Sequence, residues 1–525
     1  MNYKNILKRT KMVVIASLSA SALLLSACAM ENSDVSDKKR ISELTDGLLS
    51  DTDEKEDKTD KEEKEGKDDS GAADVNVGEA EKIDLPEIGG VKISDAGTYC
   101  LSGRTSDGMI IVDAGDEDEI DLILDGVSVT NDTSAALYIK NAGKVNIILK
   151  EGSENELSVT GEFEAIDDHN IDAALFARKA EVSISGDGKL SVSCAAGHGI
   201  VSKQDLTVYA GMIEIDSKED ALHSDKNLTV KGGDISINAE DDALHSDGDL
   251  LIEDGNIKVD ECKEGLEGTS VTINGGNIDI IAKDDGINAA NGGTEESGSK
   301  ENGAANDMFA VDEACIVTIN GGCVNIISSG DGLDSNGNVE INGGEVYISG
   351  PENDGNAAFD YNGSAVINGG VFFATGMSGM AQGFSDGSSQ AYMMLSFENG
   401  NAGDEIAVSD GNGNALKSFT AANKYNSVLI SLPDFAENGT YSVRAGSNEK
   451  DVTLSGKSYS EQGGMNGGFM RGQKGDFDAD MQNGERPEEG MTPPDMQNGE
   501  RPEGMMPPDM QNGERPEGMT PKGRK

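Results

Sequence analysis

The segment Asp220-Ala-Leu-His-Ser-Asp225 returns unchanged as Asp242-Ala-Leu-His-Ser-Asp247, 22 residues later. Related acidic segments follow at a similar step, the last of them after an insertion: Glu264-Gly-Leu-Glu267, Asp285-Gly-Ile-Asn288 and Asp331-Gly-Leu-Asp334. A glycine corner keeps the same step, as in Asn274-Gly-Gly-Asn277 and Asn342-Gly-Gly-Glu345. A period of this length indicates a repeat architecture, in which each unit packs on its neighbours.

Each repeat contains short runs of alternating apolar and polar residues, such as Val271-Thr-Ile-Asn274 and Asn277-Ile-Asp-Ile-Ile281. Such alternation predicts half-buried strands. A unit this short cannot bury its inward side chains alone, so the units must stack in register. The Leu-x-x-Leu-x-Leu frame of leucine-rich repeats is absent. The sequence therefore predicts an all-β protein built on a parallel β-helix, which is a solenoid.

The composition along the chain predicts where this solenoid begins and ends. We expect the parallel β-helix over residues 86–385 and a small antiparallel β module over 386–460, where the period is lost. Residues 51–70 contain 11 acids and 5 lysines, which predicts that 29–85 is an acidic disordered tether. Residues 461–525 repeat Met-Gln-Asn-Gly-Glu-Arg-Pro and are predicted to be a Met/Pro/Gly-rich disordered tail.

The first 28 residues have the pattern of an export signal. Basic residues precede an apolar run from Met12 to Leu25, which is too short for a confident membrane span. The run ends in Leu25-Ser-Ala-Cys28, which resembles the lipobox of bacterial lipoproteins. This resemblance implies that Cys28 carries a lipid anchor and that the protein is extracytoplasmic, attached to the cell membrane. An ordinary signal peptide with an incidental cysteine is the alternative.

The overall charge excludes some classes of partner. The chain has 42 basic and 97 acidic side chains, so its formal net charge is 42 − 97 = −55. Such a charge argues against direct binding to nucleic acid or to an anionic membrane face. The segment from 86 to 460 holds 64 acids and 21 bases, so 21 − 64 = −43 of this charge belongs to the predicted fold. The protein is expected to be a monomer.

The repeat also predicts two columns of polar side chains, because equivalent positions in a parallel stack lie about 4.8 Å apart. The first column contains Asp220, Asp242, Glu264, Asp285 and Asp331. The second column, three residues on, contains His223, His245, Glu267, Asn288, Asp334 and Asp360. Stacked carboxylates repel, and raised pKa values or a bound cation relieve the repulsion.

Oxygen-rich ligands favour Ca²⁺, and the nearby Asp225 and Asp247 add to the candidate ligand set. Three alternatives stay open at this point. The acids could simply cap turns that face water, where each repulsion costs about 1 kcal/mol. His223 and His245 could instead indicate zinc, although no cysteine lies nearby as a further ligand, or they could be a stacked pair of imidazoles.

Three stretches carry a resemblance to a known family: Lys283-Asp-Asp-Gly-Ile-Asn-Ala-Ala290, Ser329-Gly-Asp-Gly-Leu-Asp-Ser-Asn-Gly337 and the segment from Gly350 to Tyr361. They resemble the bacterial carbohydrate-binding domain-containing lipoproteins of the pectin- and polygalacturonate-binding type. The resemblance implies a right-handed parallel β-helix similar to polysaccharide lyases, which binds polygalacturonate with Ca²⁺ and has no established catalysis. The expected carbohydrate contacts are Lys263, Lys283, Asn288, Phe359 and Tyr361.

An enzyme and a structural spacer are the competing functions. A polygalacturonase-like hydrolase would place Gly-His-Gly after its acid pairs, whereas Gly197-His-Gly199 precedes them, and no arginine occurs from 179 to 443. A uronate lyase needs a basic residue as proton acceptor, for which only Lys263 and Lys283 are well placed. We therefore expect a surface protein without catalytic residues that binds acidic polysaccharide through Ca²⁺, with a lyase or an adhesin spacer as alternatives.

Overall fold

The computed structural model describes residues 79–166, 171–291 and 310–461. The signal peptide and lipobox predicted at 1–28, most of the tether and nearly all of the tail lie outside these residues. Within the described ranges the chain is all-β, with no α-helix, and 32 strands join one sheet whose pairings are mostly parallel. The described residues contain no helix that is long and apolar enough to cross a membrane. The predicted all-β class and parallel stacking are confirmed.

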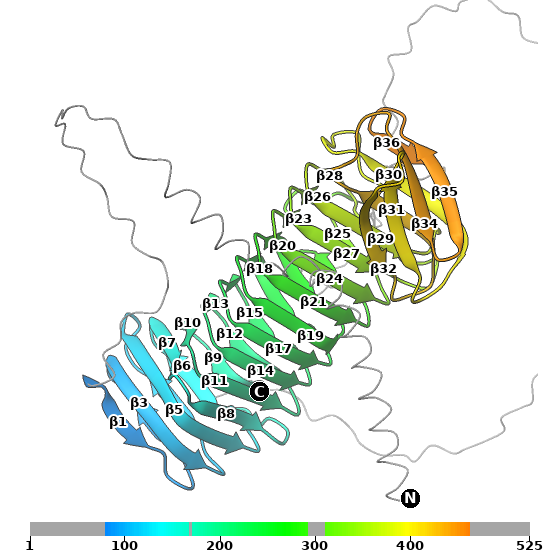
Figure 1. The fold of residues 1–525 in the computed structure, drawn as a ribbon. Helices are drawn as coiled ribbons and strands as arrows, with labels where there is room; N and C mark the ends of the chain where they lie inside the picture. Colours follow the sequence, from blue (N-terminus) through cyan, green and yellow to red (C-terminus); the bar gives the residue numbers. More distant parts are fainter. Residues whose placement is uncertain (1–78, 167–170, 292–309, 462–525) are drawn as a thin grey trace, which may run out of the picture. The chain divides into compact units, whose positions relative to one another are not determined.

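Three parallel ladders run side by side along the stack of coils (Figure 1). The first ladder contains the ends of β3 (Gly97–Thr105) and β5 (Glu119–Asn131), then β8 (Glu154–Val159), β11 (Lys189–Cys194), β14 (Met212–Ser217), β17 (Asp234–Ala239), β19 (Asn256–Cys262), β21 (Asn277–Ala282), β24 (Cys323–Ser328), β27 (Glu345–Ser349) and β29 (Val371–Gly376). The second contains β1 (Glu81–Asp84), the starts of β3 and β5, β7 (Lys144–Leu149), β10 (Glu181–Gly186), β13 (Leu206–Val208), β16 (Leu228–Val230), the ends of β18 (Leu244–Ile252) and β20 (Leu266–Ile273), β23 (Ile316–Ile319), β26 (Asn338–Ile341) and β28 (Ala365–Ile367).

The third ladder is the one that carries the polar columns. It contains β2 (Val91–Ile93), β4 (Ile110–Asp113), β6 (Leu137–Asn141), β9 (Ala173–Ala177), β12 (His198–Ser202), β15 (Leu222–Ser224), the starts of β18 and β20, β22 (Ile287–Ala289) and β25 (Leu333–Ser335). The strands here are short, and the next residues turn the chain into the second ladder.

Both ends of the stack differ from its middle. β1 begins at Glu81, before the boundary of 86 expected from sequence. The charged composition of β1 resembles that of the predicted tether, but the strand pairs in parallel with β3. At the other end, β29 pairs antiparallel with β33 (Tyr425–Ser431), which pairs with β30 (Tyr392–Gly400), itself parallel to β36 (Ser458–Ser460). A separate antiparallel sheet has the order β32 (Ala415–Thr420), β31 (Glu405–Asp410), β34 (Thr440–Ala445), β35 (Asn448–Thr453).

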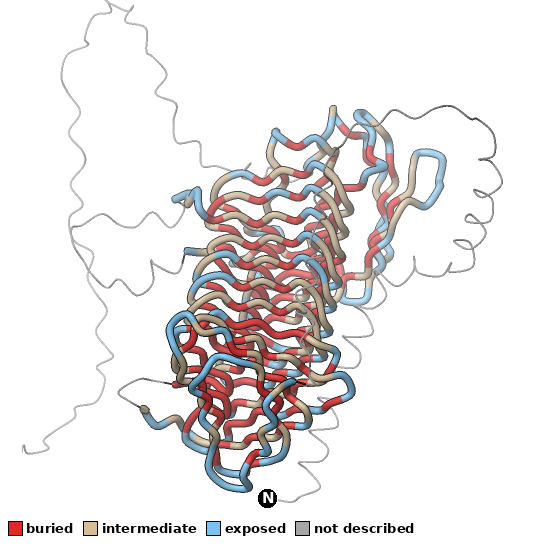
Figure 2. Tube along the Cα trace, turned by 90° about the vertical axis from the view of Figure 1, so that its left-hand side faces the viewer, coloured by how far each residue is buried: buried red, intermediate tan, exposed pale blue. Residues whose placement is uncertain are grey.

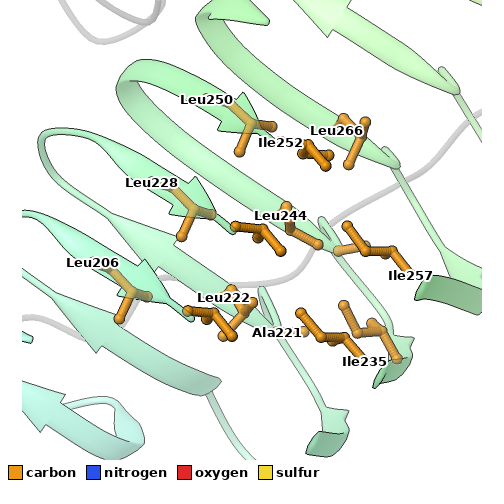
Figure 3. Close-up of a cluster of buried hydrophobic side chains, with 14 of the residues drawn as sticks. Leu206, Ala221, Leu222, Leu228, Ile235, Leu244, Leu250, Ile252, Ile257 and Leu266 are labelled. Carbon is orange, nitrogen blue, oxygen red and sulfur yellow. The ribbon is translucent and has the colours of Figure 1, made fainter. Parts of the chain in front are cut away.

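The core lies inside the coils, and buried residues alternate with less buried ones along much of each ladder (Figure 2). Leu222, Leu244 and Leu266 stack in register, and each is 0% exposed. Leu206, Leu228 and Leu250 form a parallel column beside them (Figure 3). Burial of a leucine contributes about 1.5–3 kcal/mol, so these columns are the main source of stability.

Glycine is required at the corners between the second and first ladders. Gly276 has a φ of 87°, and a Cβ there would lie 2.7 Å from the carbonyl oxygen of Gly255 in the preceding coil. The asparagines before these corners bond to one another, with Asn320 Nδ2 donating to Asn274 Oδ1 at 2.8 Å and Asn342 Nδ2 donating to Asn320 Oδ1 at 2.9 Å. This asparagine ladder fixes the register of the coils.

Leu250 and its neighbour Leu251 provide a test of the stack. Leu250 is fully buried, whereas Leu251 faces outward from the same strand and is partly exposed. Leu250→Ala should lower the free energy of unfolding by about 2–5 kcal/mol because it leaves a cavity in the core. Leu251→Ala should cost less than about 1 kcal/mol. Urea denaturation followed by circular dichroism measures both, and equal losses would contradict this assignment of inward and outward faces.

Candidate metal and carbohydrate site

The register of the third ladder produces the two columns expected from the repeat. Leu222, Leu244, Leu266, Ile287 and Leu333 are successive partners, so the acids two residues before them lie above one another. His223, His245, Glu267, Asn288 and Asp334 are likewise successive partners. Asp360 lies in the following coil, where its N–H donates to the carbonyl of Leu333 at 2.9 Å. We call the two columns together the polar ladder.

The N-terminal part of the ladder pairs acids with imidazoles. We call it the histidine segment; it comprises His198, Asp220, His223, Asp242 and His245. Its ring nitrogens lie close to carboxylate oxygens: His223 Nδ1 is 2.8 Å from Asp220 Oδ2, and His245 Nδ1 is 3.0 Å from Asp242 Oδ2. The two rings stack with centroids 4.7 Å apart and planes 10° apart. This contact agrees with the stacked-imidazole alternative.

The acids and imidazoles of this segment compensate one another. Burial opposes ionisation of Asp220, but the neighbouring His198 and His223 imidazoles hold the pKa of its carboxyl well below the usual range. Burial likewise opposes a charge on His245, yet its contacts with Asp242 and Glu267 raise its pKa to about 11. In the metal-free protein the histidine segment is therefore a set of ion pairs between imidazoles and carboxylates.

The outer acids Asp225 and Asp247 complete these pairs. Asp225 Oδ1 lies 3.2 Å from His223 Nε2 and 2.8 Å from Lys203 Nζ. Asp247 Oδ1 lies 3.3 Å from His245 Nε2. Both candidates are close to the ladder, but each already has a basic partner. They are better suited to holding the imidazoles than to binding Ca²⁺.

The C-terminal part of the ladder is different. We call it the acid segment; it comprises Asp285, Asp331, Asp334 and Asp360. Carboxylate oxygens of the first three lie within 4.8 Å of one another. Among the residues that the structure describes, no lysine, arginine or histidine forms an ion pair with any of the four, whose carboxylates are half-buried. Negative charge is thus concentrated here without a counter-ion.

The pKa values of the acid segment are raised by burial first and, for Asp285, Asp331 and Asp334, also by neighbouring acids. Burial, followed by the charges of Asp331 and other acids, raises the pKa of Asp285 to about 8 and that of Asp334 to about 8. Burial raises the pKa of Asp331 to about 6, although the Ala357 N–H donates to its carboxylate at 2.5 Å. Without a cation, Asp285 and Asp334 hold protons near neutral pH, and a divalent cation would displace these protons.

Asn288 provides a neutral oxygen at the boundary of the two segments. Its Nδ2 donates to Glu264 Oε2 at 2.9 Å, while its Oδ1 is buried and has no hydrogen-bond partner among the described residues. An orphaned amide oxygen beside several carboxylates suits a hard cation that takes six to eight oxygen ligands. The acid segment and Asn288 therefore fit Ca²⁺ better than the histidine segment does.

Between the segments, Asp242 lies close to both Glu264 and Glu267, with oxygens within 4.8 Å. Glu267 Oε2 is 2.9 Å from His245 Nδ1, so this carboxylate forms an ion pair with the histidine segment. Burial raises the pKa of Glu264, whose carboxylate faces Asn288. Glu264 is consequently a possible additional ligand next to the acid segment.

The two expected lysine contacts lie at the rim of the ladder. Lys263 Nζ is 3.3 Å from Asp241 and 3.7 Å from Glu264, and Lys283 pairs with Glu261. Burial lowers the pKa of Lys263, but the surrounding acids, Asp242 first, raise it overall. A lysine held protonated is a poor proton acceptor at neutral pH, which disfavours the lyase alternative.

Phe359 and Tyr361 are not available to a sugar, which corrects the expectation from sequence. They are 2% and 3% exposed, and Phe359 packs with its ring centroid 5.0 Å from that of Phe384. The Tyr361 hydroxyl donates to the carbonyl of Gly383 at 2.6 Å. The chain alternates at this point, so Asp360 faces outward while both aromatic neighbours face the core.

His198 is a member of the ladder that the sequence analysis considered only within Gly-His-Gly. It occupies the position one coil before Asp220, because Ile200 is the register partner of Leu222. Its Nδ1 lies 3.3 Å from Asp220 Oδ2, and its Nε2 lies 2.8 Å from Glu219 Oε2. The 22-residue step to Asp220 was the signal that could have identified it.

Comparison with known proteins identifies proteins that are similar to this chain. A profile described as "Carbohydrate-binding domain-containing protein" matches residues 89–355. A curated protein of the same description from Acetivibrio thermocellus is 41% identical over 127 residues, which is 24% of this chain. The match spans 44% of that relative's own length.

A solved structure is also similar, described as "Structure of the polysaccharide lyase-like protein from C. thermocellum, Gadolinium derivative". It is 27% identical, with a TM-score of 0.34, and the match covers 54% of this chain and 89% of that one.

The acid segment should make the metal-free protein less stable as the pH rises. Between about pH 4, where an unfolded aspartate ionises, and pH 8, folded Asp285 and Asp334 retain protons that the unfolded chain has lost. The folded state then binds more protons, so the free energy of unfolding falls with increasing pH. His245, with its pKa raised to about 11, contributes in the same direction above about pH 6.5.

Asp334→Asn separates the effect of the acid segment on the pH dependence of stability from the effect of His245, because it removes one acid and leaves the imidazoles intact. In chelator, its melting temperature should exceed that of the wild type at pH 8, and the two should approach each other near pH 5. Differential scanning calorimetry over this range gives the comparison. Parallel curves for both proteins would show that the acid segment does not carry the pH dependence.

Proposed function

Because the chain belongs to the carbohydrate-binding domain-containing protein family, we propose that it binds an acidic polysaccharide of the polygalacturonate or pectin type through Ca²⁺ held by the acid segment. The observation that carries this proposal is the group of carboxylates at Asp285, Asp331 and Asp334, which lack a basic partner among the described residues. In this proposal the stack of coils is a right-handed parallel β-helix, and the ladder lies along one of its faces.

Charge explains why a cation belongs in this mechanism. The segment from 86 to 460 carries a formal charge of −43, so it should repel a polyuronate chain. A Ca²⁺ ion takes six to eight oxygen ligands, more than three carboxylates in monodentate contact supply. The half-buried acids leave one side of such an ion open to solvent, where uronate oxygens would complete the coordination.

The residues around the acid segment are suited to binding a polysaccharide rather than to cleaving it. Lys263 and Lys283 are engaged with acids and remain protonated, so their role is to neutralise the rim and to contact uronate carboxylates. Asn288 offers an amide to the metal or to the sugar. A uronate lyase and a purely structural adhesin are the alternatives, and formation of an unsaturated product or absence of glycan binding would favour them respectively.

The proposal also places the protein outside the cytoplasm. We infer that residues 1–28 direct export and that Cys28 is lipidated, which leaves the chain attached to the cell membrane as a monomer. The acidic segment that follows would then separate the coil stack from the membrane, since like charges keep such a chain extended.

The Ca²⁺ hypothesis predicts a specific loss in Asp334→Asn. The substitution removes a charge but little volume, so the coils should keep their β-rich circular dichroism. Retention on immobilised polygalacturonate should fall at least about tenfold, because metal affinity depends on ligand charge. Wild-type retention should likewise be lost in chelator and restored by added Ca²⁺. Affinity chromatography and calorimetric titration with Ca²⁺ measure these effects.

Asp254→Asn is the matched control, because Asp254 is an exposed acid at a glycine corner away from the third ladder. It should bind Ca²⁺ and polygalacturonate as the wild type does. If Asp334→Asn loses Ca²⁺ but retains the glycan, the bridging mechanism is wrong and the sugar binds elsewhere.

The anchor is tested independently of the glycan. Cys28→Ser should release the protein from the membrane fraction, because a serine cannot accept the lipid and the proposed tether offers no other anchor. Fractionation of cells that express each form, followed by immunodetection, gives the result. Continued membrane association of the variant would refute the lipobox interpretation.

A further inference from the structure

The histidine segment contains a group of ligands that the Ca²⁺ proposal does not use. The chain has four histidines in 525 residues, and three of them, His198, His223 and His245, lie in this one part of the polar ladder. Imidazole nitrogens are poor ligands for Ca²⁺ but good ligands for zinc and its neighbours in the first transition series. A site here would thus differ chemically from the acid segment.

His198, Asp220 and His223 have the geometry of a metal-binding triad. Asp220 Oδ2 lies 2.8 Å from His223 Nδ1 and 3.3 Å from His198 Nδ1, and the three ligand atoms are within 4.8 Å of one another. Zinc holds nitrogen and oxygen ligands at about 2.0–2.2 Å in tetrahedral geometry, which places ligand atoms about 3.3–3.6 Å apart. The His198 contact already has this spacing, whereas the His223 contact is a hydrogen bond that would have to lengthen by about 0.5 Å.

The orientation of the rings favours this triad over the stacked pair. The His198 and His223 rings are tilted by 54°, with centroids 5.3 Å apart, and the Nδ1 atoms of both rings lie within 3.3 Å of the same Asp220 oxygen. The His223 and His245 rings are nearly parallel, so their nitrogen lone pairs, which lie in the ring planes, do not converge on one point. One ion therefore fits between His198 and His223 but not between His223 and His245.

The triad is also enclosed on the inner side. Asp220 is 4% exposed, and His223 follows Val201, which is 1% exposed, in the register of the ladder. In the next coil Asp242 is 4% exposed, and its Oδ1 has no hydrogen-bond partner among the described residues. A buried carboxylate oxygen without a partner is costly, and a nearby cation would offset that cost.

We propose that His198, Asp220 and His223 bind one divalent transition-metal ion of the zinc type, at a site separate from the acid segment. In the metal-free protein, the Asp220 N–H donates to His198 Nδ1 at 3.1 Å and a proton lies between His223 and Asp220. The ion replaces both of these interactions. The acid segment keeps its preference for Ca²⁺, since its ligands are all oxygen.

Titration of the full chain with Zn²⁺ at pH 8, in the presence of excess Ca²⁺, tests the site. We expect one ion per chain to bind in a way that depends on His223, and Co²⁺ to give a visible absorption spectrum typical of nitrogen ligation. His223→Gln should weaken this binding at least about tenfold, since even the loss of an outer-shell partner costs 10–100-fold. Circular dichroism confirms that each variant is folded.

His245→Gln is the matched control, because it removes the same kind of side chain one coil away from the triad. It should retain Zn²⁺ binding, and Asp334→Asn should lose Ca²⁺ while retaining Zn²⁺. The proposal is refuted if the wild type binds no Zn²⁺, if Ca²⁺ displaces it, or if the two histidine variants lose it equally. In the first case the imidazoles act only as counter-ions, and the Ca²⁺ proposal is unaffected.

Discussion

The in-register stacking of parallel coils is the constraint on which the rest of the structure depends. Each residue lies directly above its counterpart in the preceding coil, so a repeated sequence places like side chains against one another. Inside the coils this is favourable, because leucine on leucine buries apolar surface. On the outer face it is costly wherever the repeated residue is charged, and the third ladder has to accommodate that cost.

The third ladder does so in three different ways along its length. Before the histidines, its outward column contains Tyr138, Phe176 and Val201, which belong to a small buried cluster and carry no charge. It continues with His223 and His245, whose charges are matched by neighbouring carboxylates. Beyond Asn288 the column has acids alone; burial raises the pKa values of Asp334 and Asp360, and neighbouring acids raise that of Asp334 further. The same backbone thus supports apolar packing, ion pairing and uncompensated charge in turn.

Much of this arrangement could be predicted from the sequence, because a 22-residue repeat and the spacing of parallel strands together determine which residues share a column. The identity of the columns and the inward direction of Leu222 and Leu244 follow from those two facts. The division of the ladder was harder to foresee, since it depends on whether each carboxylate meets an imidazole or another carboxylate. Distances between side-chain atoms, such as that between His245 and Glu267, decide this.

The errors have local physical causes. Phe359 and Tyr361 were expected to contact sugar, but alternation in an extended chain puts both neighbours of the outward Asp360 in the core. The start of the stack was expected too late because β1 has charged residues at three of its four positions. Edge strands with charged side chains are common because they prevent pairing with other chains.

Comparison of the coils with one another shows which acids the fold itself requires. The position of Asp220 is occupied by Ala173 two coils earlier, and that of His223 by Val201 one coil earlier, without any break in the parallel pairing. Carboxylates are therefore not needed to build a coil of the third ladder. Elsewhere on the surface, acids are balanced by lysines from an adjacent coil, as Glu240 is by Lys218 and Glu261 by Lys283.

The acid segment follows neither of these patterns, because it is charged where the fold tolerates apolar residues and lacks the lysine partners found elsewhere in the described coils. Half-buried carboxylates in such an arrangement lower the stability of the folded chain by their mutual repulsion. In the metal-free protein, protons on Asp285 and Asp334 offset part of this cost near neutral pH. In the function proposed above, a divalent cation would take the place of these protons and stabilise the folded chain.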